Sequence, residues 1–132
     1  MKLNTKILMV TSALFMGAFG VIASFLPDEL LTSVGITPIG MEPLAVQLMG
    51  AVYLGFTFIN WMSKGLIIGG IYARPLTMGN FLHFTVGSLS LIKGVTSHPE
   101  SKFVWIAMPF YLVFALLFGY VLFTHPIDRN KP

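Results

Sequence analysis

Residues 103–123 read FVWIAMPFYLVFALLFGYVLF, and this stretch contains no charged side chain. A helix needs ~20 mainly apolar residues to cross the roughly 30 Å of hydrocarbon in a bilayer. The stretch has that length, so it predicts a membrane-spanning helix. Its many aromatic residues favour contact with lipid or with a partner subunit, and Pro109 is expected to kink it.

Three more stretches of similar length precede it in the chain. Residues 7–26 and 43–62 are uncharged, and residues 75–95 carry a single charge, on Lys93. Together the four stretches predict an all-α fold, an integral membrane four-helix transmembrane bundle. The chain of 132 residues has room for one small domain, so we expect a single transmembrane domain over 1–132.

The composition supports this class. Hydrophobic residues make up 55% of the chain and charged residues 10%, whereas soluble domains usually carry roughly 25% charged residues. The chain has no cysteine, which excludes disulfides, iron–sulfur clusters and cysteine nucleophiles. The basic residues lie at the ends of the apolar segments, a pattern typical of membrane anchoring, so we expect no nucleic-acid partner.

The boundary between the second and third stretches admits two interpretations. Residues 65–73 are apolar, but Lys64 and Arg74 bracket them. Proline suits the first turn of a helix, so we interpret 63–74 as an interfacial loop and expect the third helix to begin at Pro75. The alternative is a helix that begins at Leu66 and kinks at Pro75, which would place Arg74 inside the membrane at considerable cost.

Lysine and arginine in short loops indicate the orientation. With both termini in the cytoplasm, six basic residues lie on the cytoplasmic side and two, Lys93 and Lys102, on the other. The six are Lys2, Lys6, Lys64, Arg74, Arg129 and Lys131. We therefore expect cytoplasmic N- and C-termini.

The first stretch also has features of a signal peptide, with a basic start and a candidate cleavage site at Val21-Ile22-Ala23. Its apolar run is longer than a usual signal core, which favours a retained helix. In the following loop, Pro27 with Asp28 and Glu29 behind it indicates a helix start, and Gly35 a stop. We expect a short helix on the outer membrane surface.

Small and polar residues mark the faces that should pack. In the first stretch, small residues recur at spacings of three and four: Ala13, Gly17, Gly20 and Ser24. The second stretch has a polar face of Gln47, Gly50, Tyr53, Thr57, Asn60 and Trp61, and the third one of Asn80, His83, Gly87 and Ser90. Polar groups are costly in hydrocarbon unless paired, so we expect these two faces to turn inward, against each other.

His83 is the most distinctive candidate, because it is the titratable group inside a predicted span apart from tyrosines. Four interpretations of His83 are open. In the first it is a buried histidine hydrogen-bonded to a neighbour such as Asn60, Tyr53 or Ser90. In the others it contacts the headgroup of a quinone-like ligand, relays a proton, or binds a haem or metal. Lys64 and Arg74 either anchor the chain at the interface or bind an anionic headgroup. The predicted ligand-binding residues are His83, Asn80, Tyr53, Asn60, Ser90, Lys64 and Arg74.

Recognisable catalytic patterns are missing. No Asp or Glu lies within a predicted span, which disfavours carboxylate-based ion coupling and paired-carboxylate catalysis. His98 and His125 are not spaced to join His83 in a metal site. The sequence therefore predicts no catalytic residue and no metal, leaves the cofactor unknown, and favours a protein that is not an enzyme.

Four short motifs resemble the small four-helix DoxX-like membrane proteins of bacteria. They are Leu26-Pro27 with Gly35-Ile36, the run 48–55 (LMGAVYLG), Asn60-Trp61, and Arg74-Pro75-Leu76 with Gly79-Asn80. The resemblance implies a multi-pass protein of the bacterial cytoplasmic (inner) membrane. Most such proteins have no assigned chemistry, and some resemble subunits of quinone-linked oxidoreductases. It brings no catalytic residue to this chain.

The leading functional hypothesis is an accessory subunit, or a binder of a hydrophobic ligand such as a lipid or quinone between the second and third helices. The alternatives are a small oligomeric transporter or channel and, third, a membrane enzyme acting on lipids. The expected partners are membrane lipids and either further copies of this chain or a larger membrane complex.

Overall fold

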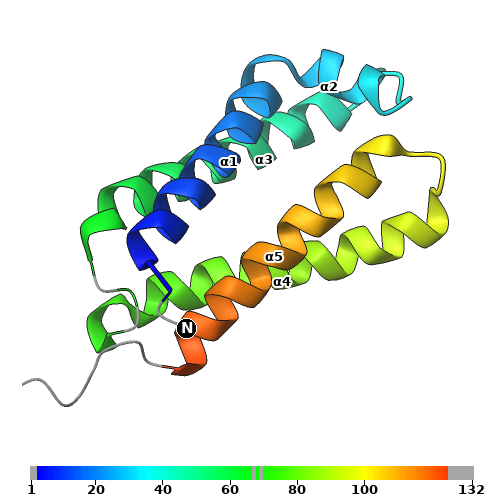
Figure 1. The fold of residues 1–132 in the computed structure, drawn as a ribbon. Helices are drawn as coiled ribbons and strands as arrows, with labels where there is room; N and C mark the ends of the chain where they lie inside the picture. Colours follow the sequence, from blue (N-terminus) through cyan, green and yellow to red (C-terminus); the bar gives the residue numbers. More distant parts are fainter. Residues whose placement is uncertain (1–2, 67, 69, 125–132) are drawn as a thin grey trace, which may run out of the picture. The chain divides into compact units, whose positions relative to one another are not determined.

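The computed structural model describes residues 3–66, 68 and 70–124. Within these ranges the regular structure is entirely helical, as the sequence predicts (Figure 1). The helices are α1 (Thr5–Phe25), α2 (Pro27–Ser33), α3 (Glu42–Met62), α4 (Arg74–Ser97) and α5 (Lys102–Thr124), with short 3₁₀ turns η1 (Ser63–Gly65) and η2 (Ile71–Ala73).

The chain divides into two compact units, and each is described by itself. The α1–α3 unit is residues 9–64 and holds most of α1 together with α2 and α3. The α4–α5 unit is residues 65–132 with residues 1–8. The single domain over 1–132 stays a prediction.

The long helices α1, α3, α4 and α5 lie where the sequence predicts spans at 7–26, 43–62, 75–95 and 103–123, with small shifts at their ends. Between α3 and α4 the described residues form only the turns η1 and η2, so the alternative helix beginning at Leu66 is not found there. Helix α4 begins at Arg74, and Pro75 occupies its first turn. A proline there loses no hydrogen bond, because the first N–H groups of a helix have no intrahelical acceptor.

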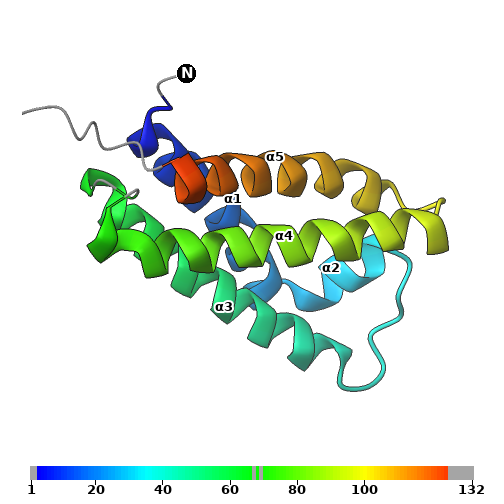
Figure 2. The ribbon, with the colours of Figure 1, turned by 90° about the horizontal axis from the view of Figure 1, so that it is seen from below.

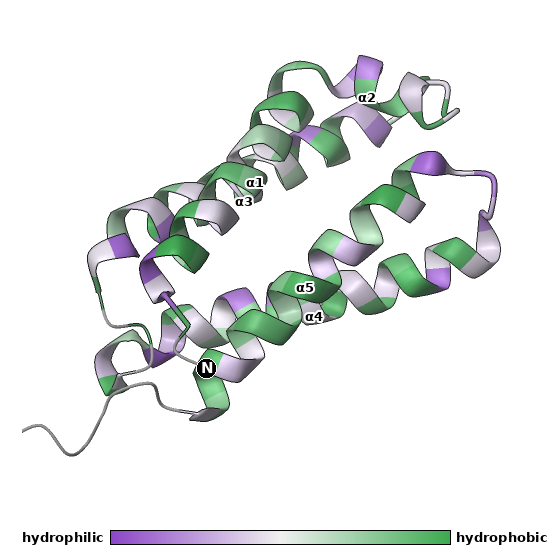
Figure 3. Cartoon of the chain, viewed as in Figure 1, coloured by the Kyte–Doolittle hydropathy of each residue, from purple (hydrophilic) through white to green (hydrophobic). Residues whose placement is uncertain are grey.

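Among the residues that the structure describes, three segments are long and apolar enough to cross a membrane: Thr5–Phe25, Glu42–Gly65 and Lys102–Thr124. They support the interpretation as a membrane protein. Helix α4 has 24 residues and is therefore about 36 Å long, but it is less apolar than these three. Figure 3 shows hydrophilic residues gathered on α2 and at the connection between α4 and α5, with mostly hydrophobic residues along α1 and α5.

Within the α1–α3 unit, glycines bring the helix backbones close together. A Cβ atom on Gly50 of α3 would lie 2.7 Å from the backbone nitrogen of Ser24, and one on Gly20 of α1 would lie 3.1 Å from that of Leu54. A Cβ atom on Gly17 would lie 3.0 Å from the side-chain methyl group of Thr57. The packing role predicted for the small residues of the first helix is confirmed for Gly17, Gly20 and Ser24, and their partner is α3.

Helix α2 begins and ends as the sequence predicts. Pro27 stands in its first turn, followed by Asp28 and Glu29. At its end Gly35 has φ +82°, and the N–H groups of Gly35 and Ile36 donate to the carbonyls of Thr32 and Leu31, both at 3.0 Å. This is a Schellman motif, in which glycine supplies the left-handed backbone. The placement of α2 on the outer membrane surface stays a prediction.

In the α4–α5 unit the two helices run side by side, joined by a short connection (Figures 1 and 2). The ring of Phe84 on α4 stacks on Phe114 and Phe118 of α5, at centroid distances of 4.8 and 5.8 Å. Phe81 packs against Gly119 and lies edge-on to Phe123. Helix α5 continues through Pro109.

This pairing corrects the expectation that the aromatic residues of 103–123 face lipid or a partner subunit. Tyr111, Phe114 and Phe118 are buried, whereas Trp105 and Phe110 are exposed. The inner aromatic residues recur at spacings of four and three, which places them on one side of the helix, and α4 covers that side.

Candidate functional site

The seven predicted ligand-binding residues are distributed over both units. Tyr53, Asn60 and Lys64 belong to the α1–α3 unit. Arg74, Asn80, His83 and Ser90 all lie on α4. The apposition of the two polar faces, and a ligand site between them, stay predictions, so the surroundings of each residue are described within its own unit.

Asn60 joins α3 to α1 through a buried polar contact. Its Nδ2 donates to Oγ of Ser12 at 3.1 Å and lies 3.9 Å from Sδ of Met16. The Ser12 hydroxyl in turn donates to the carbonyl of Met9 at 3.0 Å. Asn60 and Ser12 are both fully buried. This arrangement joins two apolar helices through paired polar groups, which is a structural role.

Tyr53 also packs against α1. Its ring lies 4.7 Å from the ring of Phe19, in a tilted arrangement, and the residue is buried. One turn later, the hydroxyl of Thr57 donates to the Tyr53 carbonyl at 2.8 Å. The predicted polar face of α3 is thus turned toward α1 at Gly50, Tyr53, Thr57 and Asn60, while Gln47 and Trp61 are exposed.

His83 lies at the contact between α4 and α5. Its ring centroid is 5.7 Å from that of Tyr111 and 5.0 Å from that of the neighbouring Phe84. Nothing in the sequence pattern indicates Tyr111 directly as a partner of His83. The one available signal was Gly87, which follows His83 by one helical turn and leaves room for a large side chain from another helix.

The other α4 candidates differ in burial. Asn80 is fully buried, and its Nδ2 donates to the Leu76 carbonyl at 3.0 Å. Ser90 is exposed, and its hydroxyl donates to the Val86 carbonyl at 3.0 Å. The predicted partner face of Ser90 lies on α3, in the other unit, so the expectation that Ser90 turns inward stays a prediction.

The buried positions of α4 are Thr77, Asn80, Phe84 and Ser88. From Asn80 the buried face continues every fourth residue, to Phe84 and Ser88. The predicted face also begins at Asn80 but continues through His83 and Gly87 to Ser90. Thr77 was missed by the sequence analysis. Its hydroxyl is a hydrogen-bond donor to the carbonyl of Ile68 and, at 3.2 Å, to that of Ala73, so it ties the preceding segment to α4.

Of the two predicted cations, Lys64 lies in the turn η1 after α3, and Arg74 follows η2 as the first residue of α4. The Lys64 Nζ lies 3.4 Å from the centroid of the Trp61 ring, a cation–π contact. Arg74 is exposed at the first residue of α4. Neither side chain forms an ion pair with another described residue.

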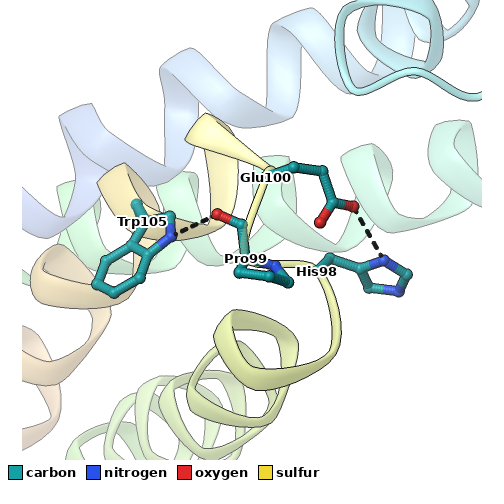
Figure 4. Close-up of polar contacts among 4 residues, drawn as sticks. All are labelled: His98, Pro99, Glu100 and Trp105. Carbon is teal, nitrogen blue, oxygen red and sulfur yellow. Dashed lines mark hydrogen bonds and ion pairs between the residues drawn. The ribbon is translucent and has the colours of Figure 1, made fainter.

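An ion pair does form in the connection between α4 and α5 (Figure 4). His98 Nδ1 lies 3.4 Å from Oε1 of Glu100, and both side chains are largely exposed. The indole nitrogen of Trp105 donates to the Pro99 carbonyl at 3.0 Å, which holds the connection against the first turn of α5. No three histidine, aspartate or glutamate side chains gather into a metal site in the part of the chain that the structure describes.

No family model, curated protein or solved structure matches this chain. The resemblance to DoxX-like proteins therefore stays a hypothesis, and the function is inferred from the helices and their polar residues.

Proposed function

We propose that the chain is a non-enzymatic protein of the cytoplasmic membrane that crosses the bilayer four times with both termini in the cytoplasm. Its role is that of an accessory subunit or of a binder of a hydrophobic ligand such as a lipid or quinone. The observation that carries the proposal is the pairing of α4 with α5 along their length.

The pairing supports a fourth crossing by α4. Contacts run from Gly94 with Val104 near the connection to Phe81 with Phe123 near the other end of α5. Helix α5 is long and apolar enough to span a membrane. Because α4 lies beside it throughout, a bilayer that holds α5 also surrounds α4.

Five polar residues of α4 are compatible with that depth, because their side-chain donors are used within the unit. Polar groups in hydrocarbon are tolerated when they are hydrogen-bonded internally. The side-chain hydroxyl and amide groups that donate to nearby backbone carbonyls belong to Thr77, Asn80, Ser88, Ser90 and Thr96. This lowers the cost of placing a moderately polar helix in the membrane.

The outward faces support a role in contacting hydrophobic molecules. Large apolar side chains are well exposed on α3 at Phe58, on α4 at Leu89 and on α5 at Leu116. At this depth such faces meet acyl chains, an isoprenoid tail or a partner helix. The His83 and Tyr111 rings bring a nitrogen-bearing and a hydroxyl-bearing side chain into the same apolar unit, and these are suited to the polar end of such a ligand.

Single cysteines test the topology cleanly, since the chain has none of its own. Ser33→Cys, Ser63→Cys and Ser101→Cys place one thiol in each connection. A membrane-impermeant maleimide on intact cells should label residues 33 and 101, and should label residue 63 only after permeabilisation. Labelling of residues 63 and 101 from the same side would show that α4 does not cross.

Native mass spectrometry of the protein released from mild detergent tests the functional part. The expected result is a retained lipid, quinone or partner subunit, with ligand retention lowered by His83→Ala. His98→Ala, which changes a histidine in the exposed connection, is the matched control and should leave retention unchanged. A bare monomer under all mild conditions would contradict the proposal.

A further inference from the structure

The segment from the end of α3 to the start of α4 has a one-sided charge pattern. Its charged residues are Lys64 and Arg74, and the sequence contains no Asp or Glu between Glu42 and Glu100. Both cations therefore lack an acidic neighbour along this part of the chain. Arg74 is exposed and Lys64 is half-buried, and cations at a surface that the protein does not neutralise attract anions from outside it.

Lys64 is held at the end of α3 by Trp61. The ammonium group lies on the face of the indole ring, 3.4 Å from its centroid, and Trp61 is about half exposed, at 45%. Tryptophan prefers the headgroup level of a bilayer, because its ring is apolar and its N–H is polar. The contact thus keeps the lysine charge at headgroup depth. An ammonium has three N–H donors, and a ring face cannot engage all of them.

Arg74 has a similar setting in the other unit. It is exposed at the first residue of α4, and close before it Ile71 and Tyr72 are also strongly exposed, at 82% and 102%. An exposed isoleucine and tyrosine beside an arginine are typical of a segment at a membrane interface. The guanidinium group binds phosphate oxygens with two parallel hydrogen bonds.

Acidic residues lie at the opposite ends of the same helices. Glu42 begins α3, whereas Lys64 follows its last residue. Glu100 follows the end of α4, whereas Arg74 begins it. The α1–α3 unit therefore presents a cation at one end of α3 and a carboxylate at the other. In the α4–α5 unit, Glu100 lies in the sequence between Lys93 and Lys102, whereas Arg74 at the opposite end of α4 has no carboxylate near it in the sequence.

We propose that Lys64 with Trp61, and Arg74 with Tyr72, bind the phosphate groups of anionic phospholipids at the membrane interface. Each pair acts within its own unit and engages a headgroup independently. The inference rests on the membrane location proposed above, and it adds a lipid selectivity that simple anchoring does not require. A basic residue near an anionic surface typically strengthens binding about fivefold.

The test uses the full chain in nanodiscs of equal phosphatidylglycerol and phosphatidylcholine, with the lipids retained after purification quantified by mass spectrometry. Wild type should retain phosphatidylglycerol several-fold over phosphatidylcholine. K64Q/R74Q should reduce this preference by about fivefold or more. The matched control K93Q/K102Q removes the same amount of charge, next to the connection between α4 and α5. It should keep the preference for phosphatidylglycerol.

Further variants separate charge from folding and lipid from free phosphate. Lys64→Arg keeps the charge and should keep the preference, and circular dichroism should show unchanged helix content in every variant used. An equal loss in K64Q/R74Q and in its control, or no loss in either, would overturn the proposal. Displacement of phosphatidylglycerol by millimolar inorganic phosphate would assign a free-phosphate site instead of a lipid site.

Resistance to alkaline carbonate extraction reports membrane integration alone. It should be the same for wild type and K64Q/R74Q. Lost lipid preference with intact integration therefore concerns only the headgroup contacts, whereas lost integration of wild type would count against the proposed function.

Discussion

Gly87 lies so close to Tyr111 that a Cβ atom on residue 87 would stand 2.5 Å from Cε1 of the tyrosine ring. Tyr111 is buried, and the rings of Phe84 and His83 pack beside it, so it has little room to move away. The approach of α4 to α5 therefore depends on the missing side chain at residue 87.

Replacing Gly87 with alanine should destabilise the α4–α5 unit. Overpacking of a well-filled site typically costs about 1–3 kcal/mol, which exceeds the ~1 kcal/mol that alanine gains over glycine in a helix. Unfolding of the purified protein by sodium dodecyl sulfate, followed by circular dichroism, measures the change. Gly55→Ala is the control, because a Cβ there meets nothing within 4 Å, and it should be neutral or stabilising. Equal stability of the two variants would contradict the close packing.

Gly50→Ala should disturb the α1–α3 unit more than Gly17→Ala. At residue 50 the new methyl group would meet backbone atoms of Ser24 and Ala23, which cannot rotate away. At residue 17 it would meet the side-chain methyl group of Thr57 at 3.0 Å, a contact that a small shift relieves. The same denaturation assay ranks the two variants, and the reverse order would show that the helices approach differently.

Two Thr→Val changes in α4 should have different effects. Thr77→Val removes the donor to the Ile68 and Ala73 carbonyls and should cost about 1–3 kcal/mol, since buried acceptors lose their partner. Thr85→Val replaces a hydroxyl that is buried without a hydrogen-bond partner among the described residues, and should be neutral or stabilising. The two substitutions are chemically identical, so their difference in unfolding free energy isolates the hydrogen bonds. A costly Thr85→Val would show that its hydroxyl has a partner.

The contact between Asn60 and Ser12 should appear as a coupling energy. Hydrogen bonds between membrane helices average ~0.6 kcal/mol and reach about 1.7 kcal/mol in such measurements. A double-mutant cycle of Asn60→Ala and Ser12→Ala, with unfolding free energy as the readout, should give a value in that range. Additive effects of the two changes would mean that the 3.1 Å contact contributes nothing to stability.

The sequence predicted the helices well, because each local signal had one physical meaning. Apolar runs of about 20 residues predicted the long helices. Pro75 predicted the start of α4 to within one residue, and Pro27 with Gly35 predicted both ends of α2. Proline in a first turn and glycine in a left-handed end position depend on the backbone alone, so neighbouring helices do not change them.

The faces of α4 and α5 were predicted less well, because they depend on which helix lies alongside. In a membrane span apolar residues occupy every side, so hydrophobicity does not mark the inner face. Ser90 was assigned inward by its polarity alone, and within its own unit its hydroxyl donates to the Val86 carbonyl of the same helix. Tyr111 was expected to face outward because its helix is apolar and rich in aromatic residues. Its ring instead packs against Gly87 of α4, where no side chain occupies the space. Shape complementarity decided the position of Tyr111, and it is not visible in one helix alone.

The modest polarity of α4 also bears on the order of membrane insertion. On the proposed topology, α4 reaches the translocon before the more apolar α5, and alone it is the weaker candidate for entry into lipid. The connection between them is short and is held by the bond from Trp105 to the Pro99 carbonyl. On this topology α4 and α5 enter the bilayer together as a helical hairpin. Helix α4 stays at the translocon until α5 has been synthesised.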